Sequence, residues 1–167
     1  MESVQLYPLD HPQQKWEGNA WEELSGIKAE QVWPLLVDFC GLNKWFPALP
    51  TCLLAEGING QPGCVRYCAG FKTHLDNGED GVVNWTKQKL LSVDREQMSL
   101  TYCIIDGNVG FQSYLATWKV TKIEGGCRVE WRYEVEPVDG WKPEDLSSFV
   151  RSGLRGMAIK IAQVFQA

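Results

Sequence analysis

The alternation of apolar and charged residues is clearest in the segment CRVEWRYEV, residues 127–135. Its odd positions from 129 to 135 are Val, Trp, Tyr and Val, and its even positions from 128 to 134 are all charged. Successive side chains of a β-strand point to opposite faces, so a period of two means one buried face and one wet face. This segment is therefore predicted to be a strand at the wall of a core.

A helical period of three to four residues runs through the C-terminal segment, residues 143–165. Pro143 suits the first position of a helix, and Glu144 and Asp145 suit its first turn, where negative charge is stabilised. The apolar positions that follow the period are Leu146, Phe149, Val150, Leu154, Met157, Ala158, Ile161, Val164 and Phe165. The pattern predicts an amphipathic helix of about six turns. The buried face of a sheet is the only large surface that its apolar side could cover.

Two shorter helices are expected nearer the N-terminus. Residues 29–39 carry apolar side chains at helical spacing, although Pro34 removes a backbone donor there and is expected to kink the helix. A second short helix is expected at residues 42–45, where two prolines follow and end it.

Strand-like runs separated by turn residues fill the rest of the chain. The first covers residues 16–24, and the others cover residues 52–56, 64–72, 82–93, 98–105, 111–123 and 128–136. Short strands joined by breaks rich in Gly, Asp and Asn indicate an antiparallel meander. The predicted fold is α+β: a curved antiparallel sheet wrapped around the long C-terminal helix, with two short helices closing one end. A curved sheet and a helix cannot touch everywhere, so an internal cavity is expected, and eight Trp, five Tyr and six Phe can line it.

Composition narrows the classes of function. The 167 residues suffice for a single domain, expected at residues 15–167 after a flexible leader at residues 1–14. A net charge of −5 argues against binding to nucleic acid or to an anionic membrane surface, because both need clusters of Lys and Arg. No apolar stretch is long enough to cross a bilayer, so membrane insertion is not expected.

The six cysteines are interpreted as free thiols. The N-terminus lacks the apolar core of a secretory signal, which favours a cytoplasmic protein whose thiols stay reduced. With only His11 and His74 and no C-x-x-C spacing, no metal site is expected, and no cofactor motif is found. Cys64 and Cys68 would share a strand face with Arg66, but no His lies nearby in sequence to activate a thiol. Both are therefore interpreted as small buried hydrophobes.

Arg66 interrupts the apolar run of residues 62–71 and can be interpreted in two ways. If Val65, Tyr67 and the other odd positions face the core, strand alternation points Arg66 to solvent. If Arg66 points inward instead, its permanent charge needs an anionic partner, because an uncompensated buried charge costs several kcal/mol. The residues alone leave both interpretations open.

Several stretches of the chain match a known family. They are KWEG (15–18), EQVWPLLVDF (30–39), PGCVRY (62–67), WTKQKLLSVD (85–94), MSLTY (98–102) and YLATW (114–118). With the order of elements, they resemble the plant START-like, pollen-allergen-type helix-grip superfamily. Within it the chain is most similar to the lachrymatory-factor synthase-like group of polyketide cyclase/dehydrase and lipid transport proteins. PGCVRY identifies the superfamily, whereas WTKQKL and MSLTY are more specific to the group.

The resemblance implies that Arg66 projects into the cavity and binds the acidic end of a ligand. At the position of the family's acid/base glutamate, this chain has Gln88. A carboxamide does not exchange protons near neutral pH, so Gln88 cannot serve as an acid or a base. With a neutral residue opposite Arg66, the pocket should carry net positive charge and favour a carboxylate, sulfenate or phenolate.

The expected function is the binding of a small, mostly apolar and acidic molecule, or of a lipid, between the sheet and the C-terminal helix. The candidate ligand-binding residues are Arg66, Gln88, Tyr102, Tyr114, Trp131, Leu154, Met157 and Ile161. The alternative is an isomerase or cyclase similar to lachrymatory-factor synthase, acting on an alkenyl sulfenic acid or a related molecule, with Arg66 and Gln88 as its catalytic candidates. Because Gln88 tells against that chemistry, enzymatic activity stays open, and no protein partner is identified.

Overall fold

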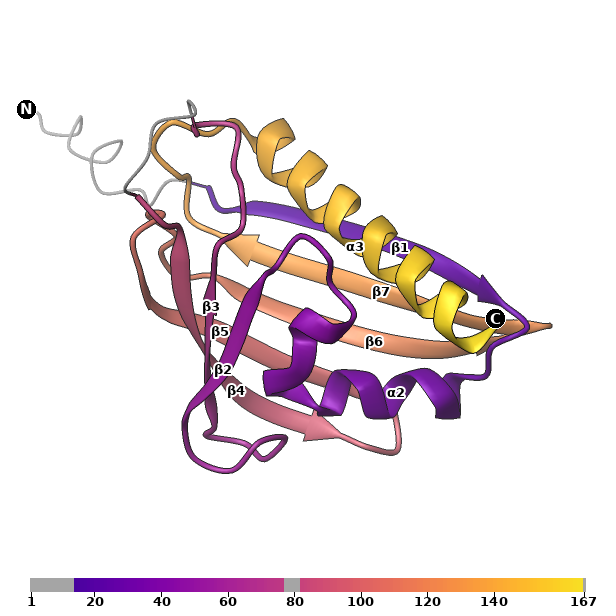
Figure 1. Ribbon diagram of the computed structural model, residues 1–167. Coiled ribbons are helices and arrows are strands. Elements are labelled where there is room, and N and C mark those ends of the chain that lie inside the picture. Colours follow the sequence, from indigo (N-terminus) through magenta and orange to yellow (C-terminus); the bar gives the residue numbers. More distant parts are fainter. Residues whose placement is uncertain (1–13, 77–81, 167) are drawn as a thin grey trace, which may run out of the picture.

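A seven-stranded antiparallel sheet forms the frame of the structure, in the spatial order β1-β7-β6-β5-β4-β3-β2 (Figure 1). The computed structural model describes residues 14–76 and 82–166, so residues 1–13 of the expected leader lie outside the described residues. The strands are β1 (Trp16–Ser25), β2 (Thr51–Glu56), β3 (Val65–Ala69), β4 (Trp85–Asp94), β5 (Ser99–Gly107), β6 (Leu115–Ile123) and β7 (Gly126–Val135). Strands β2 to β7 pair in chain order, and β1 pairs with β7. The predicted α+β helix-grip fold, with its curved antiparallel sheet, is confirmed.

The three helices lie on one side of this sheet. Figure 1 shows α3 (Pro143–Phe165), the expected C-terminal helix, running along β1 and β7, with α2 (Ala29–Val37) on the same side. Pro34 does not end α2, because the chain stays helical to Val37 and the N–H of Asp38 still donates to the Pro34 carbonyl at 3.1 Å. The second short helix is a 3₁₀ helix, η1 (Phe39–Lys44), which begins three residues earlier than expected.

Two strands begin later than the sequence pattern suggests. Strands expected from residues 82 and 111 start at Trp85 and Leu115. In both cases the neighbouring strand β5 sets the limit: its pairing with β4 begins at Gly107, and its pairing with β6 ends at Cys103. The apolar character of a segment continues beyond the point where it has a partner for its backbone hydrogen bonds.

The core lies between the sheet and α3. The odd positions of β7 from Val129 to Val135 are at most 6% exposed, as the alternation predicts. The stripe of α3 is buried at Leu146, Val150, Leu154, Met157 and Ile161, each at most 2% exposed. The last two apolar positions of the helix are at the surface, with Val164 50% and Phe165 37% exposed.

Two glycines allow aromatic side chains to approach the backbone. A Cβ at Gly18 of β1 would lie 2.2–2.3 Å from the ring and hydroxyl of Tyr133, its direct partner on β7. A Cβ at Gly153 of α3 would lie 2.4 Å from the ring of Phe46. The glycine in α3 thus lets Phe46, from the segment after η1, pack against the helix above the centre of the sheet.

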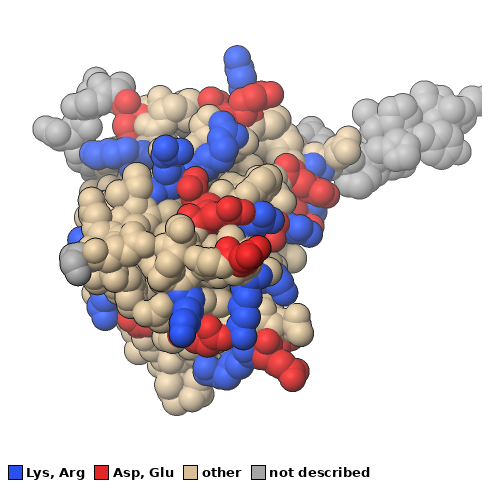
Figure 2. All heavy atoms as spheres, turned by 90° about the vertical axis from the view of Figure 1, so that its right-hand side faces the viewer, with Lys and Arg blue, Asp and Glu red and all other residues tan. Residues whose placement is uncertain are grey.

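The surface carries mixed charge. On the face that Figure 2 shows, acidic and basic side chains are interspersed rather than gathered into areas of one sign. Within residues 14–76 and 82–166, no helix combines the length and the apolar character needed to cross a membrane.

Candidate ligand cavity

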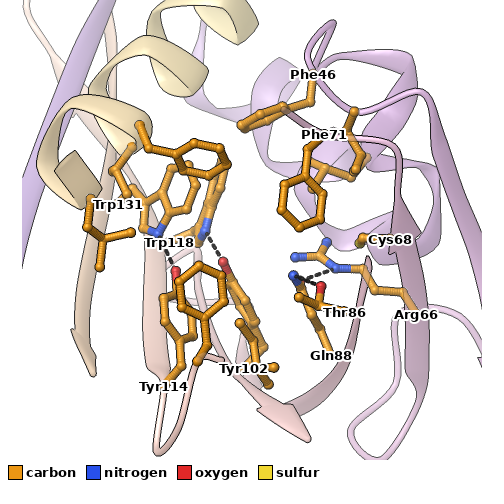
Figure 3. A pocket seen from close by; sticks show the side chains of 17 residues that line it. Phe46, Arg66, Cys68, Phe71, Thr86, Gln88, Tyr102, Tyr114, Trp118 and Trp131 are labelled. Atoms are coloured by element: carbon orange, nitrogen blue, oxygen red, sulfur yellow. Dashed lines mark hydrogen bonds between the residues drawn. The ribbon is translucent and has the colours of Figure 1, made fainter. Parts of the chain in front are cut away.

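A cavity of about 70 Å³ lies between the sheet, the segment from η1 to Leu49, and the first half of α3. Its lining is mainly apolar and aromatic. The lining residues are Leu42, Phe46, Leu49, Arg66, Cys68, Phe71, Thr86, Gln88, Tyr102, Ile104, Phe111, Tyr114, Trp118, Trp131, Leu146, Phe149 and Val150. Figure 3 shows the polar groups at two places: Arg66, Gln88 and Thr86 on one side, and two tyrosine–tryptophan pairs on the other.

Arg66 points into this cavity and is only 4% exposed. Its Nε donates to Oε1 of Gln88 at 2.8 Å, and its Nη1 donates to the carbonyl oxygen of Phe39 at 2.9 Å. The guanidinium carbon also lies 3.7 Å from the ring centre of Phe39 and 4.8 Å from that of Tyr102. The inward interpretation therefore holds. Strand alternation failed as a guide because β3 is buried on both faces, with Val65 as covered as Cys68.

No carboxylate pairs with this guanidinium among the described residues, since none of their ion pairs includes Arg66. Its neighbours are a carbonyl, a carboxamide and two aromatic rings, which stabilise a cation but do not neutralise it. The ionisable groups next to it are the thiols of Cys52 and Cys68. A buried cation held in this way favours an anion that enters the cavity.

Gln88 is held in a fixed orientation. It lies opposite Arg66 in the pairing of β3 with β4. Its Oε1 accepts from Arg66, and its Nε2 donates to Oγ1 of Thr86 at 3.0 Å. Thr86 is 2% exposed and was not among the expected site residues, although its position two residues before Gln88 places it on the same face of the strand. The carboxamide therefore positions the guanidinium but supplies no proton-transfer group.

The two tyrosines each receive a hydrogen bond from a tryptophan. Nε1 of Trp131 donates to the hydroxyl of Tyr114, and Nε1 of Trp118 donates to that of Tyr102, both at 3.2 Å. Burial raises the pKa of both tyrosines, so the hydroxyls stay protonated near neutral pH. Because the indoles are donors only, the hydroxyl hydrogens are left for other acceptors. The hydroxyl of Tyr114 donates to that of Tyr102, which leaves the hydrogen of Tyr102 for a ligand. Trp118 was not among the expected site residues, although it lies in the YLATW stretch and pairs directly with Trp131.

The expected helix wall lies elsewhere on α3. Leu154, Met157 and Ile161 are buried in the core, but none of them lines the cavity. The helix contributes Leu146, Phe149 and Val150 instead, from its first two turns. The helix also packs on β1, and Leu154, Met157 and Ile161 belong to the continuous hydrophobic core. The amphipathic pattern marks the whole buried face of a helix and does not distinguish residues over a cavity from residues over a filled core.

The lining offers hydrogen-bond donors and almost no acid/base groups. No Asp, Glu, His or Lys side chain lines the cavity within the described part of the chain. No cluster of three or more potential metal ligands occurs among residues 14–76 and 82–166 either. An apolar space with a guanidinium and tyrosine hydroxyls at its edge is suited to hold a small molecule by an anionic end.

Comparisons with known proteins agree with this architecture. Residues 24–165 match the family described as polyketide cyclase / dehydrase and lipid transport. Among solved structures, XoxI from Bacillus cereus is 23% identical with a TM-score of 0.69, covering 90% of this chain and 95% of its own. The ginseng major latex-like protein 151 from Panax ginseng is 19% identical with a TM-score of 0.65, covering 87% of this chain and 96% of its own. At these identities the structures show a common fold. The family match spans most of the chain, which therefore belongs to the polyketide cyclase / dehydrase and lipid transport family.

Proposed function

We propose that this protein binds a small, mostly apolar molecule by its anionic end, with Arg66 as the anchor. The observation that carries the proposal is a guanidinium that is 4% exposed, faces an apolar cavity and has no carboxylate partner among the described residues. The hydroxyl hydrogen of Tyr102 can donate to the same anion, because its oxygen already accepts from the Trp118 indole and from the Tyr114 hydroxyl. Several hydrogen-bond donors and one positive charge therefore face the cavity, whose lining offers few hydrogen-bond acceptors.

The volume of the cavity favours a short ligand over a long-chain lipid. One buried water needs about 10–15 Å³ of such space. A cavity of about 70 Å³ then holds roughly five to seven water-sized groups. Bonded atoms lie closer together than separate waters do, so an acid of about six to nine heavy atoms fits this space, whereas a fatty acid or a sterol requires the helix or the η1 segment to move.

Binding without catalysis is the function that the cavity supports best. The lachrymatory-factor synthase-like alternative needs an acid/base group, and the side chain at that position is Gln88. Within the group suggested by the WTKQKLLSVD and MSLTY stretches, we therefore assign the chain a binding role, as a plant protein with one START-like domain at residues 15–167. Six free cysteines fit a reducing compartment, and we place the protein in the cytoplasm on that ground.

The test is isothermal titration calorimetry with hexanoate and, as its neutral match, hexanamide. Wild-type protein should bind hexanoate more tightly than hexanamide. The Arg66→Met variant should lose about tenfold or more in hexanoate affinity, because a charged hydrogen-bond partner contributes about 1.5–3 kcal/mol. Its affinity for hexanamide should change little.

Arg132→Met is the control, since it removes one positive charge from an exposed position on the outer face of β7. Both affinities should match those of the wild type. Equal binding of hexanoate by wild-type protein and Arg66→Met would show that Arg66 is not the anchor. Release of a neutral, non-acidic ligand from protein purified from its natural source would also overturn the proposal.

A further inference from the structure

Two thiols face each other in the wall of the cavity, next to Arg66. Cys52 of β2 and Cys68 of β3 are direct partners in the antiparallel pairing of the two strands. Their sulfur atoms are 4.0 Å apart, and their residues are 5% and 2% exposed. Sγ of Cys52 donates to the carbonyl oxygen of Phe39 at 3.9 Å, and the same oxygen accepts from Nη1 of Arg66. Cys68 is itself a lining residue, whereas Cys52 is not, so a small molecule in the cavity meets the pair at Cys68.

The charge of the site favours a thiolate on Cys52. The hydrogen bond between the two thiols, in which either sulfur can donate, and the nearby charge of Arg66 outweigh burial and lower the pKa of Cys52 to about 6. The same hydrogen bond and burial raise the pKa of Cys68. The other titratable groups at this end of the sheet are Cys40 of η1, whose pKa burial raises to about 12, and Cys64. The pKa of Cys52 is therefore below that of an ordinary cysteine, which is thiolate to only a few per cent near neutral pH.

The backbone geometry permits a bond between the two sulfur atoms. Directly opposed residues of an antiparallel pair have Cα atoms about 4.5–5.5 Å apart. Disulfides span Cα separations of about 4.4–6.8 Å, so the strands need not separate. Rotation of the two side chains is enough to bring the sulfur atoms from 4.0 Å to bonding distance.

We propose that Cys52 and Cys68 are a redox-active dithiol, which a small hydroperoxide entering the cavity oxidises to a disulfide. The Cys52 thiolate attacks one peroxide oxygen, the O–O bond breaks, and the departing oxygen leaves as hydroxide or alkoxide, giving a sulfenic acid on Cys52. The sulfur of Cys68 then attacks that sulfenic sulfur, and the S–O bond breaks. The hydroxide that leaves takes the proton of the Cys68 thiol and becomes water. With hydrogen peroxide, two thiols and one peroxide give one disulfide and two water molecules. The pair is oxidised by two electrons, and the peroxide is reduced.

The site differs from the other two buried cysteines, Cys64 and Cys127. Cys127 is fully buried and burial raises its pKa to about 11, so it lacks both access and reactivity. Cys64 lies on the same segment as Cys68 and is 1% exposed, but it does not line the cavity. It is therefore the matched control position, a buried thiol of the same region that makes no hydrogen bond to Cys52 or Cys68.

The experiment treats the full-length reduced protein with hydrogen peroxide and then blocks free thiols with N-ethylmaleimide under denaturing conditions. Intact mass should show the loss of two hydrogens and of two maleimide additions. Peptide mapping should show a link between the peptides that contain Cys52 and Cys68. The rate of oxidation should rise with pH through an inflection near pH 6, rather than near the value of about 8.5 for an ordinary thiol.

Single variants separate the two roles. Cys68→Ser should stop the reaction at a sulfenic acid on Cys52, which dimedone traps. Cys52→Ser should give no linked peptide. It should also slow oxidation by about tenfold or more, because the remaining thiol, Cys68, is not activated as a thiolate. Cys64→Ser should form the disulfide at the wild-type rate.

A wild-type protein that forms no disulfide, or links a different pair, would overturn the proposal. So would an inflection of the rate above about pH 8. These two readouts need only wild-type protein, so they decide the matter even if a serine variant fails to fold. Neither requires a bound acid, so failure of the dithiol and failure of the proposed ligand function are distinguishable.

Discussion

Gln88→Glu tests the charge of the cavity more directly than the removal of Arg66. The amide oxygen of Gln88 already accepts from Nε of Arg66 at 2.8 Å, so a carboxylate oxygen fits the same place. The second carboxylate oxygen would replace Nε2 and accept from the hydroxyl of Thr86, which can donate as well as accept. Beside a guanidinium a carboxyl group stays ionised. The variant should therefore fold, and it should add one negative charge beside the guanidinium.

The size of the effect follows from the distance between the new carboxylate and a bound anion. For an anion held by the same guanidinium, we take a separation from the new carboxylate of roughly 6 Å. Two like charges at that distance repel by about 3 kcal/mol at an effective dielectric constant of about 20. This corresponds to roughly a hundredfold loss of affinity.

Calorimetric titration with hexanoate and hexanamide measures this effect. Hexanoate binding should weaken by the stated factor, and hexanamide binding should change by about threefold at most, because a neutral ligand feels little of the added charge. Gln163→Glu adds the same charge at an exposed position of α3 and should leave both affinities unchanged. If hexanoate binds Gln88→Glu as tightly as wild-type protein, or more tightly, then Arg66 and Gln88 do not act on a common ligand.

The structure makes three further predictions. Gly18→Ala should lower the free energy of unfolding by about 1–3 kcal/mol in chemical denaturation, because the added methyl group overlaps the Tyr133 ring. Unchanged stability would mean that the ring can adopt another conformation. Leu154→Ala should lower the free energy of unfolding by about 2–5 kcal/mol, because it leaves an empty space in the core. It should keep the wild-type affinity for hexanoate. A large loss of affinity would indicate that the cavity reaches along α3 to this residue. If the proposed acid-binding function holds, the protein with the Cys52–Cys68 disulfide should bind hexanoate more tightly than the reduced protein. The reason is that oxidation removes a thiolate that competes for the guanidinium. Weaker binding would argue against that competition.

Local periodicity accounts for most of what could be predicted about the fold. The period of two in β7 and the helical period in α3 arise because each element buries one face, and neither depends on the partner that covers it. The starts of β4 and β6 were predicted too early for the opposite reason. A strand ends where its neighbour ends, and that limit is a property of the assembled sheet.

The direction of Arg66 shows where periodicity fails. Alternation predicts one wet face, but β3 is covered on both sides, so the rule that reads β7 correctly pointed Arg66 outward. Only the resemblance to a family gave the inward direction. The same limit applies to Leu154 and Met157, because a buried helical face does not reveal which of its turns lies over a cavity.

The sequence alone determined the α+β class, the sheet, the long helix and the presence of enough aromatic residues to line a cavity. These follow from the order, spacing and kind of the apolar residues. Only the tertiary structure decided what meets at the cavity. Strand register brought Gln88 opposite Arg66 and Cys52 opposite Cys68, and the packing of η1 placed the carbonyl of Phe39 on both the guanidinium and a thiol. Register and packing depend on many distant contacts at once, so no local pattern of residues contains them.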